Sequence, residues 1–209
     1  MTNALTFYTN PMSRGRIARW MLEEVGCSYE TVVLDYRTSM KAADYLAINP
    51  MGKVPALRHG DVVITECAAV CAYLADAFPE AGLAPALGDP LRGAYYRWMF
   101  FAAGPVESAV TAKSMGWEAP PEKRGSIGFG SLTEVVDTLE QAVKAGPYLL
   151  GETFSAADVY LGSQIGWGTQ FKTIEDRPSF KPYLERIMSR PAAVRARAID
   201  DALLPKKPA

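Results

Sequence analysis

The chain has 209 residues, of which 49% are hydrophobic and 22% charged, and its formal net charge is −1. This composition is that of an ordinary globular protein and excludes the disordered and fibrous classes. The near-neutral charge argues against nucleic acid or an anionic membrane as the main partner.

The cellular compartment is predicted from the start of the chain and from its cysteines. The opening MTNALTFYTN lacks the basic and apolar blocks of a secretory signal, and no apolar run is long enough to span a bilayer. The three cysteines cannot all pair internally, and Cys67 and Cys71 lack the C-x-x-C spacing of a redox pair. We therefore expect a cytoplasmic protein.

The single histidine, His59, lies in the polar turn RHGD, where exposure is expected, so no metal site is predicted.

The first 80 residues alternate between strand and helix patterns. We expect, in chain order, strand 4–8, helix 14–25, strand 29–34, helix 38–48, strands 54–57 and 62–64, and helix 65–78. A strand, helix, strand unit forces a parallel pair and a hairpin an antiparallel one, so the order βαβαββα predicts a mixed sheet covered by helices.

The second half shows helical spacing alone. Residues 79–90 (PEAGLAPALGDP) have the composition of a linker, which divides the chain into domain 1–80, linker 81–90 and an all-α domain 91–209. The expected helices cover 91–114, 131–145, 156–167, 178–189 and 192–199. Residues 115–130, rich in Gly and Pro, predict a mobile loop.

Two local patterns have structural interpretations. Ser155 and Asp158 form a capping box at a helix start, which favours a structural role for Asp158 over a catalytic one. Pro55 lies inside an apparent strand, where its missing N–H would interrupt a sheet ladder. Either this is an edge strand or a turn, or the bond before Pro55 is cis and the freed backbone serves another purpose.

Several motifs together are similar to those of the cytosolic glutathione transferases, of bacterial type and unassigned class. They are NPMSRGRIARWMLEE, NPMGKVPAL followed by TECAAVCAYL, FSAADV and RPSFKPYLERIMSRP, in this order along essentially the whole chain. The resemblance implies a thioredoxin-like N-terminal domain with an all-helical C-terminal domain. It also implies a glutathione S-transferase, in which glutathione is the co-substrate, no metal is needed, and the thiolate attacks a small electrophile.

The resemblance implies which residues bind glutathione. In this family the proline of the V-P pair is cis, so Val54 before Pro55 would offer its N–H and C=O to the peptide-like ligand. Glu66 would pair with the γ-glutamyl ammonium, the helix start at Cys67 would receive a carboxylate, and Lys53 would meet the glycyl carboxylate. Relatives usually carry serine where this chain has Cys67, and a thiol is a weaker donor.

The thiol-activating group of this family usually lies just after the first strand. Ser13 is the leading candidate, since its hydroxyl could donate to the sulfur, helped by the helix dipole and by Arg14 or Arg16. The alternative is that Ser13 only caps the helix. Tyr8, Asn10 and Arg14 are the rival candidates. Arginine at position 14, where some bacterial classes carry cysteine, argues against a glutathionyl-enzyme mechanism there.

The remaining expectations concern the electrophile and the assembly. Aromatic side chains could line an apolar pocket, although about half should be core; they are Tyr95, Trp98, Phe101, Trp117 and Trp167. The family resemblance implies a homodimer and a role in detoxification. Two alternatives stay open, a non-catalytic glutathione- or ligand-binding protein of the same fold and a glutathione-dependent isomerase.

Overall fold

A computed structural model describes residues 4–204 of the chain. These residues form two compact units, 4–82 together with 189–204, and 83–188, which are described separately below. No helix in the described part of the chain is long and apolar enough to cross a membrane.

The first unit contains a mixed sheet of four strands within the described residues. They are β1 (Leu5–Thr9), β2 (Tyr29–Val33), β3 (Ala56–His59) and β4 (Val62–Thr65), in the spatial order β2-β1-β3-β4. β1 pairs with β2 in parallel and with β3 antiparallel, and β3 and β4 form the hairpin. The predicted thioredoxin-like fold is confirmed. β3 begins at Ala56, so Pro55 precedes the strand and its missing N–H interrupts no pairing.

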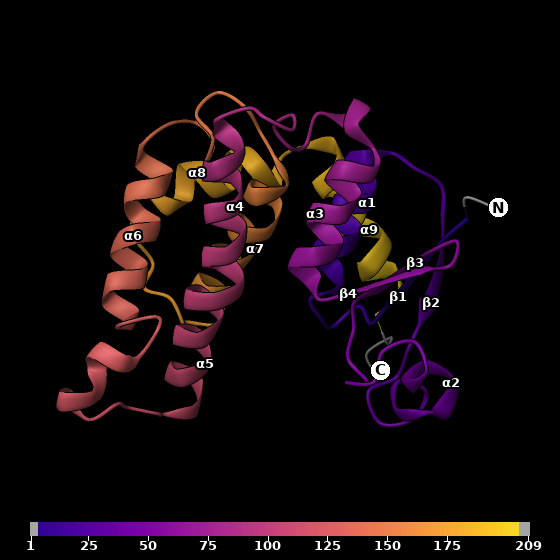
Figure 1. Ribbon diagram of the computed structural model, residues 1–209, viewed down its shortest axis with the longest axis horizontal. Coiled ribbons are helices and arrows are strands. Elements are labelled where there is room, and N and C mark those ends of the chain that lie inside the picture. Colours follow the sequence, from indigo (N-terminus) through magenta and orange to yellow (C-terminus); the bar gives the residue numbers. More distant parts are fainter. Residues whose placement is uncertain (1–3, 205–209) are drawn as a thin grey trace, which may run out of the picture. The chain divides into compact units, whose positions relative to one another are not determined.

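Three helices of this unit lie side by side: α1 (Gly15–Val25), α3 (Cys67–Ala77) and α9 (Pro191–Ala202). α1 and α3 pack on the sheet, and α9 packs along α1 (Figure 1). The predicted stop of α1 is confirmed, because Gly26 has a left-handed φ of 72° and its N–H closes the helix on the C=O of Leu22.

The helix expected over residues 38–48 is instead a 3₁₀ turn, η1 (Ser39–Lys41), and a short helix, α2 (Ala43–Leu46). The Asp35 carboxylate accepts hydrogen bonds from the N–H groups of Arg37 and Thr38, and the Ser39 hydroxyl accepts the N–H of Asp35. These local bonds compete with helical ones and hold the segment in a turn. Tyr45 of α2 packs against Tyr8 with ring centroids 5.6 Å apart.

The expected solvent exposure of His59 was wrong. Its Nδ1 lies 2.9 Å from the Tyr73 hydroxyl, and its ring stacks on Phe78 with centroids 6.0 Å apart. The half-buried imidazole therefore helps to pack β3 against α3 and the residue that follows it.

The second unit is helical, as predicted. Its helical elements are α4 (Leu91–Phe101), a π-helical turn η3 (Ala102–Val106), α5 (Glu107–Met115), a 3₁₀ segment η4 (Pro121–Ser126), α6 (Leu132–Lys144), α7 (Ala156–Gln170) and α8 (Phe180–Met188). The single helix expected over 91–114 is interrupted at Pro105, which has no N–H for a helical bond, and the backbone widens there into the π turn. The expected loop 115–130 contains the 3₁₀ segment η4. The short 3₁₀ turn η2 (Pro79–Ala81) falls in the first unit.

The capping box at α7 is confirmed and has a structural role. Ser155 and Asp158 bond reciprocally, and the buried Asp158 carboxylate also accepts the N–H of Leu149 and the hydroxyl of Tyr183. The placement of α9 differs from the expected domain 91–209, because this helix packs with α1 in the first unit. Besides Asp200, its buried residues are small, Ala192, Ala193 and Ala196, which let the two helices approach closely.

Candidate functional site

The sheet register brings three segments to one edge of the first unit. Tyr8 pairs with Ala56, so the turn after β1 lies alongside Val54 and Pro55. Ala56 in turn pairs with Thr65, which places Glu66 and the start of α3 beside the same residues. The predicted activating turn and the predicted glutathione-binding residues are therefore neighbours in the structure.

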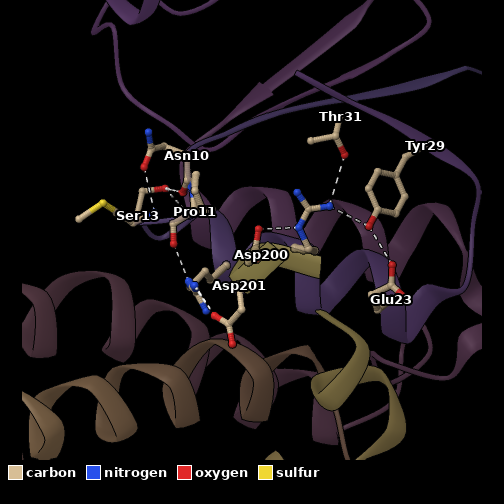
Figure 2. Close-up of polar contacts among 12 residues, drawn as sticks. Asn10, Pro11, Ser13, Glu23, Tyr29, Thr31, Asp200 and Asp201 are labelled. Atoms are coloured by element: carbon tan, nitrogen blue, oxygen red, sulfur yellow. Dashed lines mark hydrogen bonds and ion pairs between the residues drawn. The ribbon is translucent and has the colours of Figure 1, made fainter. Parts of the chain in front are cut away.

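The turn between β1 and α1 is closed by Ser13 (Figure 2). The Asn10 C=O accepts both the Ser13 hydroxyl, at 2.7 Å, and the Ser13 N–H, at 3.0 Å. The same hydroxyl oxygen accepts the N–H of Gly15 at 2.9 Å. Ser13 thus stabilises the first turn of α1, and its half-buried hydroxyl lies at the helix N-terminus, where partial positive charge accumulates.

Two of the rival candidates have contacts that favour structural roles. The Asn10 amide donates to the C=O of Leu34 at 2.7 Å and accepts the N–H of Met12 at 2.9 Å, so both its ends hold the turn. Tyr8 packs in an apolar cluster with Leu34 and Tyr45. The third rival, Arg14, is exposed at the start of α1.

Cys67 connects the start of α3 to the start of α1. Its buried thiol donates to the C=O of Arg14 at 3.5 Å. The hydrogen bond between Cys71 and Cys67, together with burial, raises the pKa of the Cys71 thiol well above its ordinary value. Cys71 is therefore a protonated packing group near neutral pH, and the two cysteines help to join the helices.

Val54, which precedes Pro55, has a half-buried side chain. The peptide bond between Val54 and Pro55 is cis, as predicted. Neither the N–H nor the C=O of Val54 forms a hydrogen bond with another described residue. The C=O of the preceding Lys53 accepts hydrogen bonds from Tyr45 and Asn49, at 2.5 and 2.8 Å, whereas the Lys53 side chain is exposed.

Glu66 occupies an unusual backbone conformation at the start of α3. Its φ is 66°, a left-handed value that is uncommon for a residue with a side chain and costs on the order of 1 kcal/mol. Its carboxylate is exposed, and the first N–H groups of the 11-residue α3 lie next to it. An anion at this helix start would meet free N–H donors and the positive end of the helix dipole.

The aromatic residues proposed to line a pocket all lie in the second unit, and their side chains differ in solvent exposure. Tyr95 and Trp98 are 0% and 7% exposed, so packing accounts for both, and these two predictions are corrected to core positions. Phe101 and Trp167 are half-buried, and Trp117 is 67% exposed. Among the described residues, no group of three or more His, Cys, Asp or Glu side chains could hold a metal ion.

Sequence reasoning missed the contacts that support this site from a distance. Tyr45 and Asn49 bind the peptide unit that carries the Val54 N–H. Arg16, expected only to assist Ser13, bonds to the C=O of Pro11 and to Asp201 of α9. The spacing of Arg16 and Arg19, one turn apart on α1, could have indicated that the two arginines share a helix face with acidic partners. Their acidic partners near residue 200 are too distant in sequence to be paired by spacing alone.

Comparison with known proteins agrees with this geometry. Residues 3–76 match the model of the glutathione S-transferase N-terminal domain, and residues 103–191 match that of the C-terminal domain. The chain is 31% identical to glutathione S-transferase F10 of Arabidopsis thaliana over 206 residues, covering 90% of this chain and 94% of that protein. It is 26% identical to glutathione S-transferase GstA of Escherichia coli O157:H7 over 174 residues, which cover 81% and 86% of the two chains.

Solved structures show the same likeness. A glutathione transferase from Methylococcus capsulatus is 31% identical, with a TM-score of 0.76 and coverage of 95% of this chain and 99% of that one. A sphingomonad glutathione S-transferase complexed with glutathione is 27% identical, with a TM-score of 0.76 and coverage of 94% and 98%.

Fold and matches together define a transferase built from a thioredoxin-like domain and a helical domain. The chain belongs to the glutathione S-transferase family. It is an enzyme of this kind, and the two alternatives left open by the sequence, a non-catalytic binding protein and a glutathione-dependent isomerase, are not favoured.

Proposed function

We propose that the edge of the first unit binds glutathione and activates its thiol for attack on a small electrophilic substrate. The single observation that carries this proposal is that the N–H and C=O of Val54 bond to no residue in the described range 4–204, at the edge that also holds the start of α3 and the turn around Ser13. A peptide-like ligand lying antiparallel to Val54 would satisfy both groups, as an added strand does.

The charged ends of glutathione have complementary partners at this edge. Its γ-glutamyl carboxylate would accept from the N–H groups at the start of α3, and the exposed Glu66 carboxylate would pair with the ammonium beside it. The exposed Lys53 ammonium would meet the glycyl carboxylate. Because Cys67 donates its thiol proton to the Arg14 C=O, the first carboxylate relies on backbone donors rather than on the Cys67 side chain.

Ser13 is the proposed thiolate-stabilising residue. A thiolate is a far better nucleophile than a thiol, so the enzyme must lower the pKa of the glutathione thiol. In the structure the Ser13 hydroxyl donates to the Asn10 C=O, and turning it toward a sulfur would exchange that bond for a charge-assisted one. The positive end of the α1 dipole would favour the same charge.

The test is the pKa of the bound glutathione thiol, followed by thiolate ultraviolet absorbance against pH. The wild type should lower this pKa, Ser13→Ala should raise it again, and Ser13→Thr, which keeps a hydroxyl, should retain part of the effect. Binding without a lowered pKa would refute thiol activation. An unchanged pKa in Ser13→Ala would reduce Ser13 to a helix cap.

We further propose a cytoplasmic homodimer with a role in detoxification. The free cysteines at positions 27, 67 and 71 favour a reducing compartment. The family resemblance supports pairing of the first domain of one subunit with the helical domain of the other. Light scattering at micromolar concentration tests the dimer, since a monomeric mass would refute it, and cell fractionation tests the compartment.

A further inference from the structure

The activating turn is held in place through its carbonyl groups. The C=O of Pro11 accepts from Arg16 Nε at 2.5 Å, that of Met12 from the Tyr36 hydroxyl at 3.0 Å, and that of Arg14 from the Cys67 thiol at 3.5 Å. These donors lie on α1, on the segment after β2 and on α3. The conformation around Ser13 therefore depends on side chains from several elements.

Arg16 also binds the far end of the chain. Its Nη2 donates to Asp201 Oδ1 at 2.7 Å, so the guanidinium bridges the C=O of Pro11 and the Asp201 carboxylate, both labelled in Figure 2. Because the guanidinium is planar, a carboxylate that fixes one N–H direction fixes the others as well. Asp201 thereby holds the Arg16 side chain in the orientation in which Nε reaches the turn.

The register of α9 on α1 is set by the neighbouring acid, Asp200. Asp200 Oδ1 accepts from Arg19 Nε at 2.7 Å, and both side chains are about 1% exposed. Arg19 also donates to the hydroxyls of Tyr29 and Thr31 on β2, at 3.1 and 3.3 Å, so this anchor reaches the sheet (Figure 2). A buried, multiply bonded pair leaves α9 little freedom to slide, and Asp201 is consequently fixed beside Arg16.

We propose that Asp201 is a positioning residue for the thiol-activating turn, acting through Arg16 on the C=O of Pro11. The last helix of the chain thus contributes to glutathione activation without touching glutathione. The link to activation rests on the proposed function of Ser13, whereas the mechanical link between Asp201 and the turn does not.

The chain provides a matched control for the decisive variant, Asp201→Ala. The guanidinium of Arg195, on α9, donates to the carboxylate and to the backbone C=O of Glu23, on α1, both at 3.1 Å. Arg195 and Asp201 are similarly exposed, at 54% and 51%, and both join α9 to α1. Arg195→Ala therefore removes a comparable ion pair at the end of α1 remote from the turn.

The first experiment is amide hydrogen exchange on the full chain without added ligand. The N–H groups of Ser13 and Gly15 should exchange about fivefold faster in Asp201→Ala, as expected for loss of a partly exposed ion pair, and β1 amides should not change. Asp201→Asn, which keeps an acceptor, should fall between. Arg195→Ala should leave the turn unchanged. Equal exchange in wild type and Asp201→Ala, or an equal effect of Arg195→Ala, would overturn the proposal.

The second experiment measures the bound-thiol pKa and the turnover of glutathione with chlorodinitrobenzene. Asp201→Ala should raise the thiol pKa by about half a unit and lower kcat, with the KM for glutathione changed by less than about twofold, since Val54 and Glu66 are untouched. Arg16→Lys keeps the charge but lacks the planar fork and should reproduce both effects.

The two experiments separate the two claims. If the wild type fails to lower the thiol pKa, the proposed role of Ser13 is refuted, and the exchange data still decide whether Asp201 orders the turn. If Ser13 activates the thiol but Asp201→Ala changes neither exchange nor pKa, the positioning role is refuted and the proposed function stands.

Discussion

The Tyr45 hydroxyl donates to the C=O of Lys53, which belongs to the same peptide unit as the N–H of Val54. In a trans peptide the C=O and N–H point in opposite directions. Tyr45 and Asn49, which bind the C=O side, therefore aim the Val54 N–H away from α2. The proposed ligand contact is oriented by side chains that lie behind it.

Removing this support should weaken glutathione binding. Tyr45→Phe deletes one hydrogen bond to the Lys53 C=O, and we expect the Kd for glutathione to rise about fivefold, corresponding to about 1 kcal/mol. Calorimetric titration measures it. Tyr73→Phe, which removes a hydroxyl bonded to His59, is the control and should bind normally. An unchanged Kd in Tyr45→Phe would show that the peptide unit needs no support from α2.

Asp158 should be a major determinant of the stability of the second unit. Its carboxylate is 0% exposed and accepts from Leu149, Ser155 and Tyr183. Asp158→Ala leaves these donors unpaired in the interior, and we expect a loss of about 2–4 kcal/mol in urea unfolding.

A side-chain cap at the start of α6 is a control for this variant. There the Ser131 hydroxyl oxygen accepts the N–H of Glu134, and the Ser131 hydroxyl donates to the exposed Glu134 carboxylate. Glu134→Ala should cost about 0.5 kcal/mol, because water replaces the lost bond. Equal costs for Asp158→Ala and Glu134→Ala would mean that burial adds nothing to the role of Asp158.

Glu140 should contribute stability that depends on pH. Hydrogen bonds from Lys144, Ser179 and Arg177 lower the pKa of Glu140 from its ordinary 4.5 to about 2. Between about pH 4.5 and pH 2, the Glu140 carboxylate therefore binds fewer protons in the folded protein than in the unfolded chain. Its contribution is complete above the unfolded pKa and is lost as the pH falls toward 2.

Melting temperatures of Glu140→Gln across pH measure this contribution. The variant should melt below the wild type near neutral pH, and the difference should close between about pH 4.5 and pH 2. Glu185→Gln, which removes an exposed ion pair with Lys181 that is 4.0 Å long, is the control and should lower the melting temperature near neutral pH by less. A gap for Glu140→Gln that persists at pH 2 would contradict the assignment.

Gly168 should tolerate no side chain. A Cβ there would lie 2.8 Å from the Cβ of Ile174, closer than real Cβ atoms approach. We expect Gly168→Ala to destabilise the second unit by about 1–2 kcal/mol in urea unfolding, despite the better helix propensity of alanine. Gly93→Ala in α4 meets nothing within 4 Å and should stabilise by up to about 1 kcal/mol. A neutral Gly168→Ala would show that the Ile174 segment yields easily.

The predicted elements agree with the structure where one local signal acts without a local competitor. The apolar spacing of residues 14–25, the stop at Gly26 and the hairpin around RHGD act within a few residues, and so does the capping box at Ser155. Predictions failed where a local competitor prevailed, as at Asp35, whose side chain replaces helical bonds, and at Pro105, which widens the helix.

The candidate site also combines features that a contiguous sequence pattern predicts with features that depend on the tertiary structure. The sequence by itself determined the motif around Val54 and Pro55, the acid at position 66 and the serine turn, because each is a contiguous pattern. Only the tertiary structure decided that these segments meet at one edge, through the register of β1, β3 and β4. It alone also paired Arg16 with Asp201, 185 residues away, since contacts across that separation depend on how α9 packs on α1.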